Sequence, residues 1–179
     1  MPMPSSTRRS MPPPGDRPVF SWFVGPAIVG VYEIFRSRGL DYRLVALGAL
    51  APLLVDLPSG RMGAGHSIVV AVAVLVVVMV GTIGRSRRLR RRLVCLPIGW
   101  FCGLVLSGAF LHDTVFLWPL LGWDPGDVGL VPPLTLLVLA EAAGIAVCAW
   151  SVGRFGLGRP DRRAAFVRDG RLTRLRPRV

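Results

Sequence analysis

Apolar residues are gathered along the chain in five runs that short polar connections separate. A transmembrane helix needs about 20 apolar residues. The runs 67–84, 93–111 and 130–150 fall within the range of about 17 to 25 residues that such a helix needs, and only the last contains a charged residue. The runs 19–35 and 44–57 are weaker, because each is short and carries an acidic residue near its end. The pattern predicts an all-α protein, an integral membrane bundle of four to five transmembrane helices.

The valine-rich run 67–84 would also suit a β-strand, but a lone strand in lipid leaves its backbone groups unpaired, so we expect a helix there. Residues 1–18 contain six prolines, which remove hydrogen-bond donors and clash with the preceding turn of a helix. We therefore expect three regions: a disordered Pro/Arg-rich arm over 1–18, a transmembrane helical domain over 19–152 and a basic cytoplasmic tail over 153–179.

The composition agrees with a membrane protein. Of the 179 residues, 52% are hydrophobic and 18% are charged, with a mean hydropathy of +0.54, which is too apolar for an ordinary soluble domain. The net charge of +12 comes from arginine alone, since the chain has no lysine. Because these arginines lie between and after the apolar runs, they predict contact with anionic lipid headgroups. No nucleic-acid-binding module is recognisable, and no nucleic acid is expected as a partner.

Arginine is unevenly distributed between the polar connections. It accumulates in 85–92 and after residue 153, whereas 112–129 contains three aspartates and no arginine. Cytoplasmic loops retain positive charge, so the chain is predicted to be a multi-pass protein of the inner (plasma) membrane with its C-terminus in the cytoplasm. Whether 19–35 crosses the bilayer or lies at its surface stays open.

The cysteines Cys95, Cys102 and Cys148 all fall within apolar runs and show no CxxC or Cys-His spacing. Their number is odd, and a disulfide framework or zinc site is not expected. A buried free cysteine behaves as a small apolar residue.

Three ionisable residues are candidates for chemistry. Asp56 and His66 flank the connection 57–65 and so lie at one membrane face, where a carboxylate and an imidazole would suit a divalent metal or a hydrolytic water. The same pattern also arises when an Asp ends one helix and a His begins the next. Glu141 lies near the middle of the last run, either as a ligand or proton carrier or as a hydrogen-bonded structural carboxyl.

Short motifs add a family resemblance. LAPLLVDLP over 50–58, continued by SGR over 59–61 and GHS over 65–67, is similar to the membrane-bound metal-dependent hydrolases described as LexA-binding, inner membrane-associated putative hydrolases. GLVLSGAF over 103–110 and an acid at Glu141 agree with it. The resemblance implies a hydrolase with a divalent metal, Zn or Mn, held by Asp56 and His66, and with Glu141 in a catalytic supporting role.

The chain departs from that family at several polar positions. Leu53 replaces the first acid of the family's Pro-Asp-x-x-Asp motif, while Gly103 and Ser107 replace a His and an Asp on the fourth span. Because a catalytic zinc needs about three protein ligands, these changes imply a divergent member with a degraded metal site. The alternative is a non-catalytic membrane interaction or scaffold protein whose basic tail binds anionic lipid or a cytoplasmic partner. A small transporter ranks last, since the chain has no internal repeat.

Overall fold

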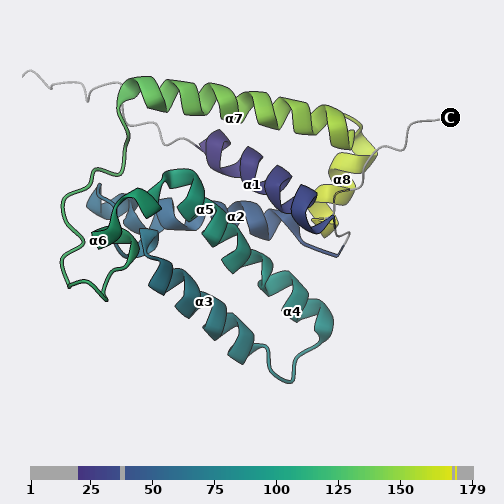
Figure 1. The fold of residues 1–179 in the computed structure, drawn as a ribbon. Helices are drawn as coiled ribbons and strands as arrows, with labels where there is room; N and C mark the ends of the chain where they lie inside the picture. The colour runs from purple at the N-terminus through teal and green to yellow at the C-terminus, as the bar shows by residue number, and fades with distance from the viewer. Residues whose placement is uncertain (1–19, 37–38, 171, 173–179) are drawn as a thin grey trace, which may run out of the picture.

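A computed structural model describes residues 20–36, 39–170 and 172, and their regular structure is entirely helical (Figure 1). The predicted arm over 1–18 lies outside the described residues. The helices are α1 (Phe20–Phe35), α2 (Tyr42–Asp56), η1 (Leu57–Ser59), η2 (Ala64–His66), α3 (Ile68–Gly81), α4 (Arg87–Leu93), α5 (Cys95–Ser107), η3 (Ala109–Leu111), α6 (Asp113–Phe116), α7 (Leu134–Phe155) and α8 (Pro160–Asp169).

The all-α class predicted from the sequence is confirmed. Two helical segments among the described residues are long and apolar enough to cross a membrane, α2 with η1 over Tyr42–Ser59 and α7. The second apolar run, a weak span by sequence, is one of them because Asp41 caps α2 ahead of the run and η1 extends it. The helices α1 and α3 are apolar but shorter, with 16 and 14 residues.

The centre of the fold is the contact between α2 and α5, where the two backbones touch. A side chain on Gly99 would collide with the carbonyl oxygen of Val45, and one on Gly103 with that of Ala49. Small residues of this kind let helices approach closely, which is how helices associate in lipid. The glycines of α5 therefore determine how α2 packs, and with it the position of the residues at its end.

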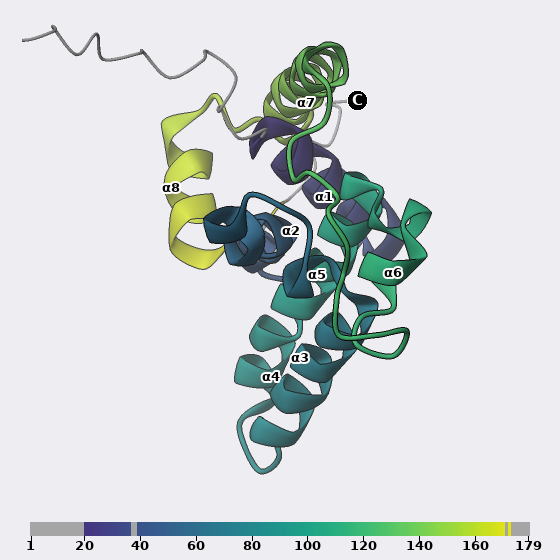
Figure 2. The ribbon, with the colours of Figure 1, turned by 90° about the vertical axis from the view of Figure 1, so that its left-hand side faces the viewer.

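α1 and α7 form a second pair beside this centre, and the second half of α7 lies along α1, while its first half extends past the start of α1 (Figure 1). Gly144 of α7 faces the backbone of Trp22, and the rings of Tyr32 and Phe155 meet edge to face with centroids 4.7 Å apart. The opposite face of α7 is exposed. Seen from the end, α7 and the hairpin of α3 and α4 lie on opposite sides of α2 and α5 (Figure 2).

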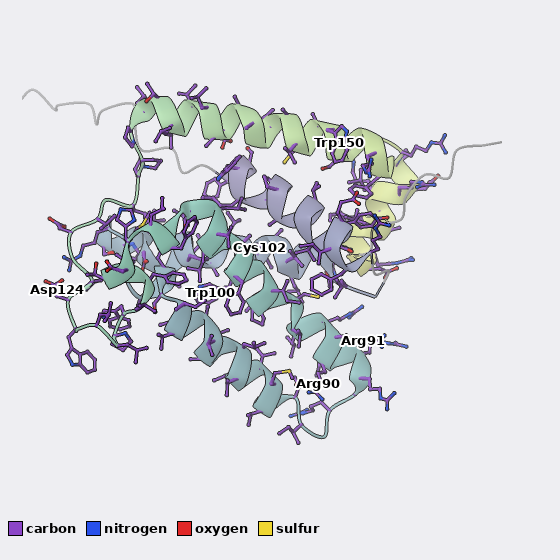
Figure 3. All side chains as sticks on the ribbon, in the orientation of Figure 1. Arg90, Arg91, Trp100, Cys102, Asp124 and Trp150 are labelled. Carbon is purple, nitrogen blue, oxygen red and sulfur yellow. The ribbon has the colours of Figure 1, made fainter. Side chains whose placement is uncertain are left out.

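Charge separates the two ends of the molecule. Asp124, in the connection between α6 and α7, lies at one end, whereas Arg90 and Arg91 of α4 lie toward the other (Figure 3). The boundary predicted at residue 153 falls inside α7, which continues to Phe155. Part of the predicted tail is the helix α8, which returns to the start of α2, where the Tyr42 N–H donates to the Gly170 carbonyl at 2.9 Å.

Candidate functional site

The loop between α2 and α3 is held from two sides. The Met62 N–H donates to the Val128 carbonyl at 2.8 Å, and the Leu130 N–H donates to the Gly60 carbonyl at 3.2 Å. From the centre of the fold, the indole N–H of Trp100 donates to the Gly65 carbonyl at 2.9 Å. These contacts fix the loop, so that its backbone groups keep a defined direction.

Asp56, the last residue of α2, is surrounded by this loop and is 4% exposed. Its carboxylate accepts backbone hydrogen bonds from Gly63 at 2.7 Å and from Gly65 at 2.9 Å. A side chain on Gly65 would lie 2.5 Å from the Pro52 carbonyl oxygen, so only glycine permits this approach. The loop thus forms a cradle of N–H donors around a buried carboxylate, which compensates the cost of burying it.

His66 completes the arrangement. Its Nδ1 lies 2.7 Å from Oδ2 of Asp56, and its side chain is 1% exposed. An ionised carboxylate can only accept hydrogen bonds, so Nδ1 carries the proton and Nε2 is left as an acceptor. Within the described part of the chain, Nε2 makes no hydrogen bond. A carboxylate that orients a histidine in this way is typical of histidines that act as a base or bind a metal.

His66 lines a cavity of about 1000 Å³. The cavity lies between the first half of α7, the ends of α2 and α5, the segment 128–133 and the start of α1, and its lining is mainly apolar. Besides the indole of Trp22, which donates to the Leu106 carbonyl at 3.0 Å, the polar side chains in its lining are His66, Ser107 and His112. A buried histidine that is oriented by a carboxylate is therefore part of the lining of a mainly apolar cavity.

Glu141 is not part of this arrangement. It accepts a hydrogen bond from the Ser21 hydroxyl of α1, and its Oε2 has no partner among the described residues. Glu141 does not line the cavity that His66 lines. The structure thus brings Asp56 and His66 together, as their spacing predicts, but not the third residue of the predicted site.

The polar positions that the resemblance leads us to expect on α5 have other roles. Gly103 packs against the backbone of α2, so a histidine there would not fit this helix contact. Ser107 lines the cavity, but its hydroxyl donates to the Leu104 carbonyl of its own helix at 3.0 Å. α5 therefore contributes close packing and one hydroxyl to the site.

The donor set does not fit a metal centre built on Asp56 and His66. Three donors occupy the two oxygens of Asp56, and the described residues contain no group of three or more His, Cys, Asp or Glu side chains that could hold a metal ion. A catalytic zinc uses about three protein ligands. The Zn or Mn expected from the resemblance stays a prediction.

Sequence reasoning missed the residues that hold the pair in place. The backbone N–H groups of Gly63 and Gly65, the indole of Trp100 and the segment 128–130 together position Asp56 and His66. The glycine spacing in GRMGAGHS over 60–67 was the available indication, because glycine permits close backbone approach.

Comparison of the chain with protein-family models, with curated proteins and with solved structures gave no match. The class of the protein is therefore defined by its fold and site. It is an all-helical protein with two helical segments of membrane-spanning length and a buried carboxylate–histidine pair beside an apolar cavity.

Proposed function

We propose that this chain is a divergent membrane hydrolase in which His66, oriented by Asp56, activates water. The observation that carries the proposal is the buried pair, 2.7 Å apart, with His66 in the lining of the cavity. A buried, hydrogen-bonded carboxylate stabilises the imidazolium that forms when His66 accepts a proton. A histidine that only filled the core would not need a hydrogen bond to a buried carboxylate beside a cavity.

In the proposed reaction His66 is the general base. Nε2 takes a proton from water while the water oxygen attacks the carbonyl carbon of an ester, and the resulting imidazolium is paired with Asp56. When the carbon–oxygen bond to the leaving group breaks, the same nitrogen returns the proton to the leaving oxygen. Ester and water become carboxylic acid and alcohol, and His66 returns to its initial state.

The proposed hydrolase crosses the membrane with four or five helices. The support for this number is the apolar surface of helices beyond the two long segments: Val76, Val77 and Val80 of α3 are each more than half exposed. Soluble proteins rarely expose contiguous apolar patches of this kind. Short helices such as α3 can span when flanking charged side chains reach the interface. In this proposal the arginine-rich end faces the cytoplasm, and the C-terminus is cytoplasmic as well.

The test is hydrolysis of a fatty-acyl p-nitrophenyl ester by the full chain purified in detergent. His66→Gln and Asp56→Asn should each lower the rate by about 100-fold or more, the range of general-base contributions. Asp161→Asn on α8, also an Asp replaced by its amide, is the matched control and should keep the rate. Elemental analysis of the same samples tests the divalent metal. Equal rates in His66→Gln and the unaltered protein, with equal melting temperatures, would refute the role of His66.

The non-catalytic alternative also has an observation in its favour. A cleft of about 250 Å³ at the other end of the molecule is lined by four arginines of α4 together with Asp41 and Asp169. Arginine next to a membrane span favours anionic lipid by about 1 kcal/mol per residue. Protein with Arg88→Gln and Arg91→Gln should retain less phosphatidylglycerol through purification than the unaltered chain. Equal retention would count against this function.

A further inference from the structure

The cavity beside His66 has a polar end and an apolar interior. His66, Ser107 and His112 come from the ends of η2, α5 and η3, near the connections that surround Asp56. Apart from the Trp22 indole, the rest of the lining is apolar and includes Phe23 of α1 and Ala140 and Ala143 of α7. A soluble polar metabolite would find few partners in such a lining, whereas an amphiphile could place its polar and apolar parts at matching ends.

The length of the apolar lining fits one leaflet of a bilayer. The stretch from Pro133, the residue before α7, to Ala143 of α7 is about 15 Å long at a rise of about 1.5 Å per residue. This is half of a hydrocarbon core of about 30 Å. The cavity is also open along α7, because Leu136 and Leu139, which line it, are 56% and 65% exposed. In a membrane this opening faces lipid chains.

We propose that the cavity takes up one acyl chain of a membrane lipid from the leaflet at the acidic end of the molecule. The ester that joins this chain to the headgroup then lies at His66, and the chain extends along the first half of α7 toward the start of α1. The part of this inference that names a lipid ester as the substrate rests on the proposed hydrolase function. The uptake of the chain needs only the cavity and its opening, so the two can fail separately.

The probe is a phosphatidylglycerol with a diazirine at the end of one acyl chain, illuminated in liposomes that contain the full-length protein. Phe23 and Leu53 line the cavity but are only 8% and 7% exposed, so lipid outside the protein does not reach them. Peptide mass spectrometry should find the label on one or both. Val31, 1% exposed and outside the cavity lining, should stay unlabelled.

Two neighbouring alanines of α7 supply a matched pair of variants. Ala143 lines the cavity and Ala142 does not, although both are exposed. Ala143→Phe should lower labelling of the cavity residues by about tenfold, equivalent to about 1.4 kcal/mol of binding. Ala142→Phe adds the same ring on the lipid side and should leave labelling unchanged.

His66→Gln separates this inference from the proposed function. It should lower ester hydrolysis by about 100-fold or more and keep the label on the cavity residues, because the chain is bound by apolar contacts. Label confined to exposed residues of α3 and α7, or labelling of Phe23 and Leu53 that Ala143→Phe does not change, would overturn chain uptake. Labelled cavity residues without any His66-dependent hydrolysis would support chain uptake and refute the hydrolase.

Discussion

The two segments that are long enough to cross a membrane have different surroundings. In the α2–η1 segment 39% of the residues are buried inside the protein, whereas in the most apolar stretch of α7 the share is 11%. α2 packs backbone to backbone on α5, while α7 rests on α1 and exposes the rest of its surface. Two segments of membrane-spanning length thus differ in how they are covered: the apolar surface of one helix packs against protein, and most of the apolar surface of the other is exposed.

Each segment also carries one acid, and the two acids differ in the same way. Asp56 accepts hydrogen bonds from two backbone N–H groups and from His66. Glu141 has the Ser21 hydroxyl on one oxygen and no described partner on the other. The comparison shows that an acid within an apolar segment indicates an organised site only when the surrounding chain supplies hydrogen-bond donors to it.

The largest effect is expected from breaking the contact of α2 with α5. Gly103→Leu places a side chain against the Ala49 backbone and should destabilise the protein by more than about 4 kcal/mol, because backbone atoms cannot move aside as a side chain can. Gly153→Leu on α7 meets open space and is the control, with little loss expected. Thermal unfolding in detergent measures both. Similar melting temperatures would contradict the contrast between the two segments.

The next largest effect compares the two acids. Asp56→Ala leaves two buried N–H groups and His66 without their acceptor, at about 1 to 3 kcal/mol for each unsatisfied group, so a total loss above about 3 kcal/mol is expected. Glu141→Ala removes one hydrogen bond and an oxygen without a described partner, so the expected loss is below about 1 kcal/mol. Chemical unfolding in mixed micelles tests this. A larger loss for Glu141→Ala would mean that it, and not Asp56, organises its surroundings.

A smaller effect is expected at the end of α2 opposite Asp56. Burial would raise the pKa of Asp41, but hydrogen bonds from Arg43 and the charges of Arg43 and Arg92 lower it below its usual 3.8. The folded protein thus holds the proton less tightly than the unfolded chain, and the stabilisation is present above pH 3.8 and lost as the pH falls through the folded pKa. Asp41→Asn keeps a capping side chain and should cost about 1 kcal/mol at neutral pH.

The pH dependence itself is the measurement for Asp41. Melting temperatures of Asp41→Asn and the unaltered protein should differ at pH 7 and converge as the pH falls below 3.8, the usual pKa of the group, through its lower pKa in the folded protein. Glu33→Gln is a control at the α1–α7 pair, where Glu33 and Arg154 meet at 2.6 Å but are 34% and 29% exposed. A pair of this exposure is worth about 0.5 kcal/mol. A constant difference for Asp41→Asn at every pH would show that its charge contributes nothing.

Much of the architecture could be predicted from local patterns. The unpaired backbone groups of a lone strand in lipid predict a helix for the valine-rich run 67–84, and α3 occupies Ile68–Gly81 of it. Asp56 and His66 were placed at one face by the short connection between them, and the structure puts them 2.7 Å apart. The predicted partnership with Glu141 does not appear, because it depended on how α7 packs, and no local pattern records that.

The order of apolar and polar residues by itself determined the helical class and the accumulation of arginine away from the connection 112–129, whereas only two helical segments reach membrane-spanning length among the described residues. The helical class follows from chain-local physics, since backbone groups in lipid must pair within a helix. Only the tertiary structure decided that α2 is enclosed while α7 is exposed, and that Gly63 and Gly65 direct their N–H groups at Asp56. Such features depend on contacts between residues far apart in the chain. Here Trp100 and Val128 both hydrogen-bond to the loop between α2 and α3, and their spacing in the sequence does not predict these contacts.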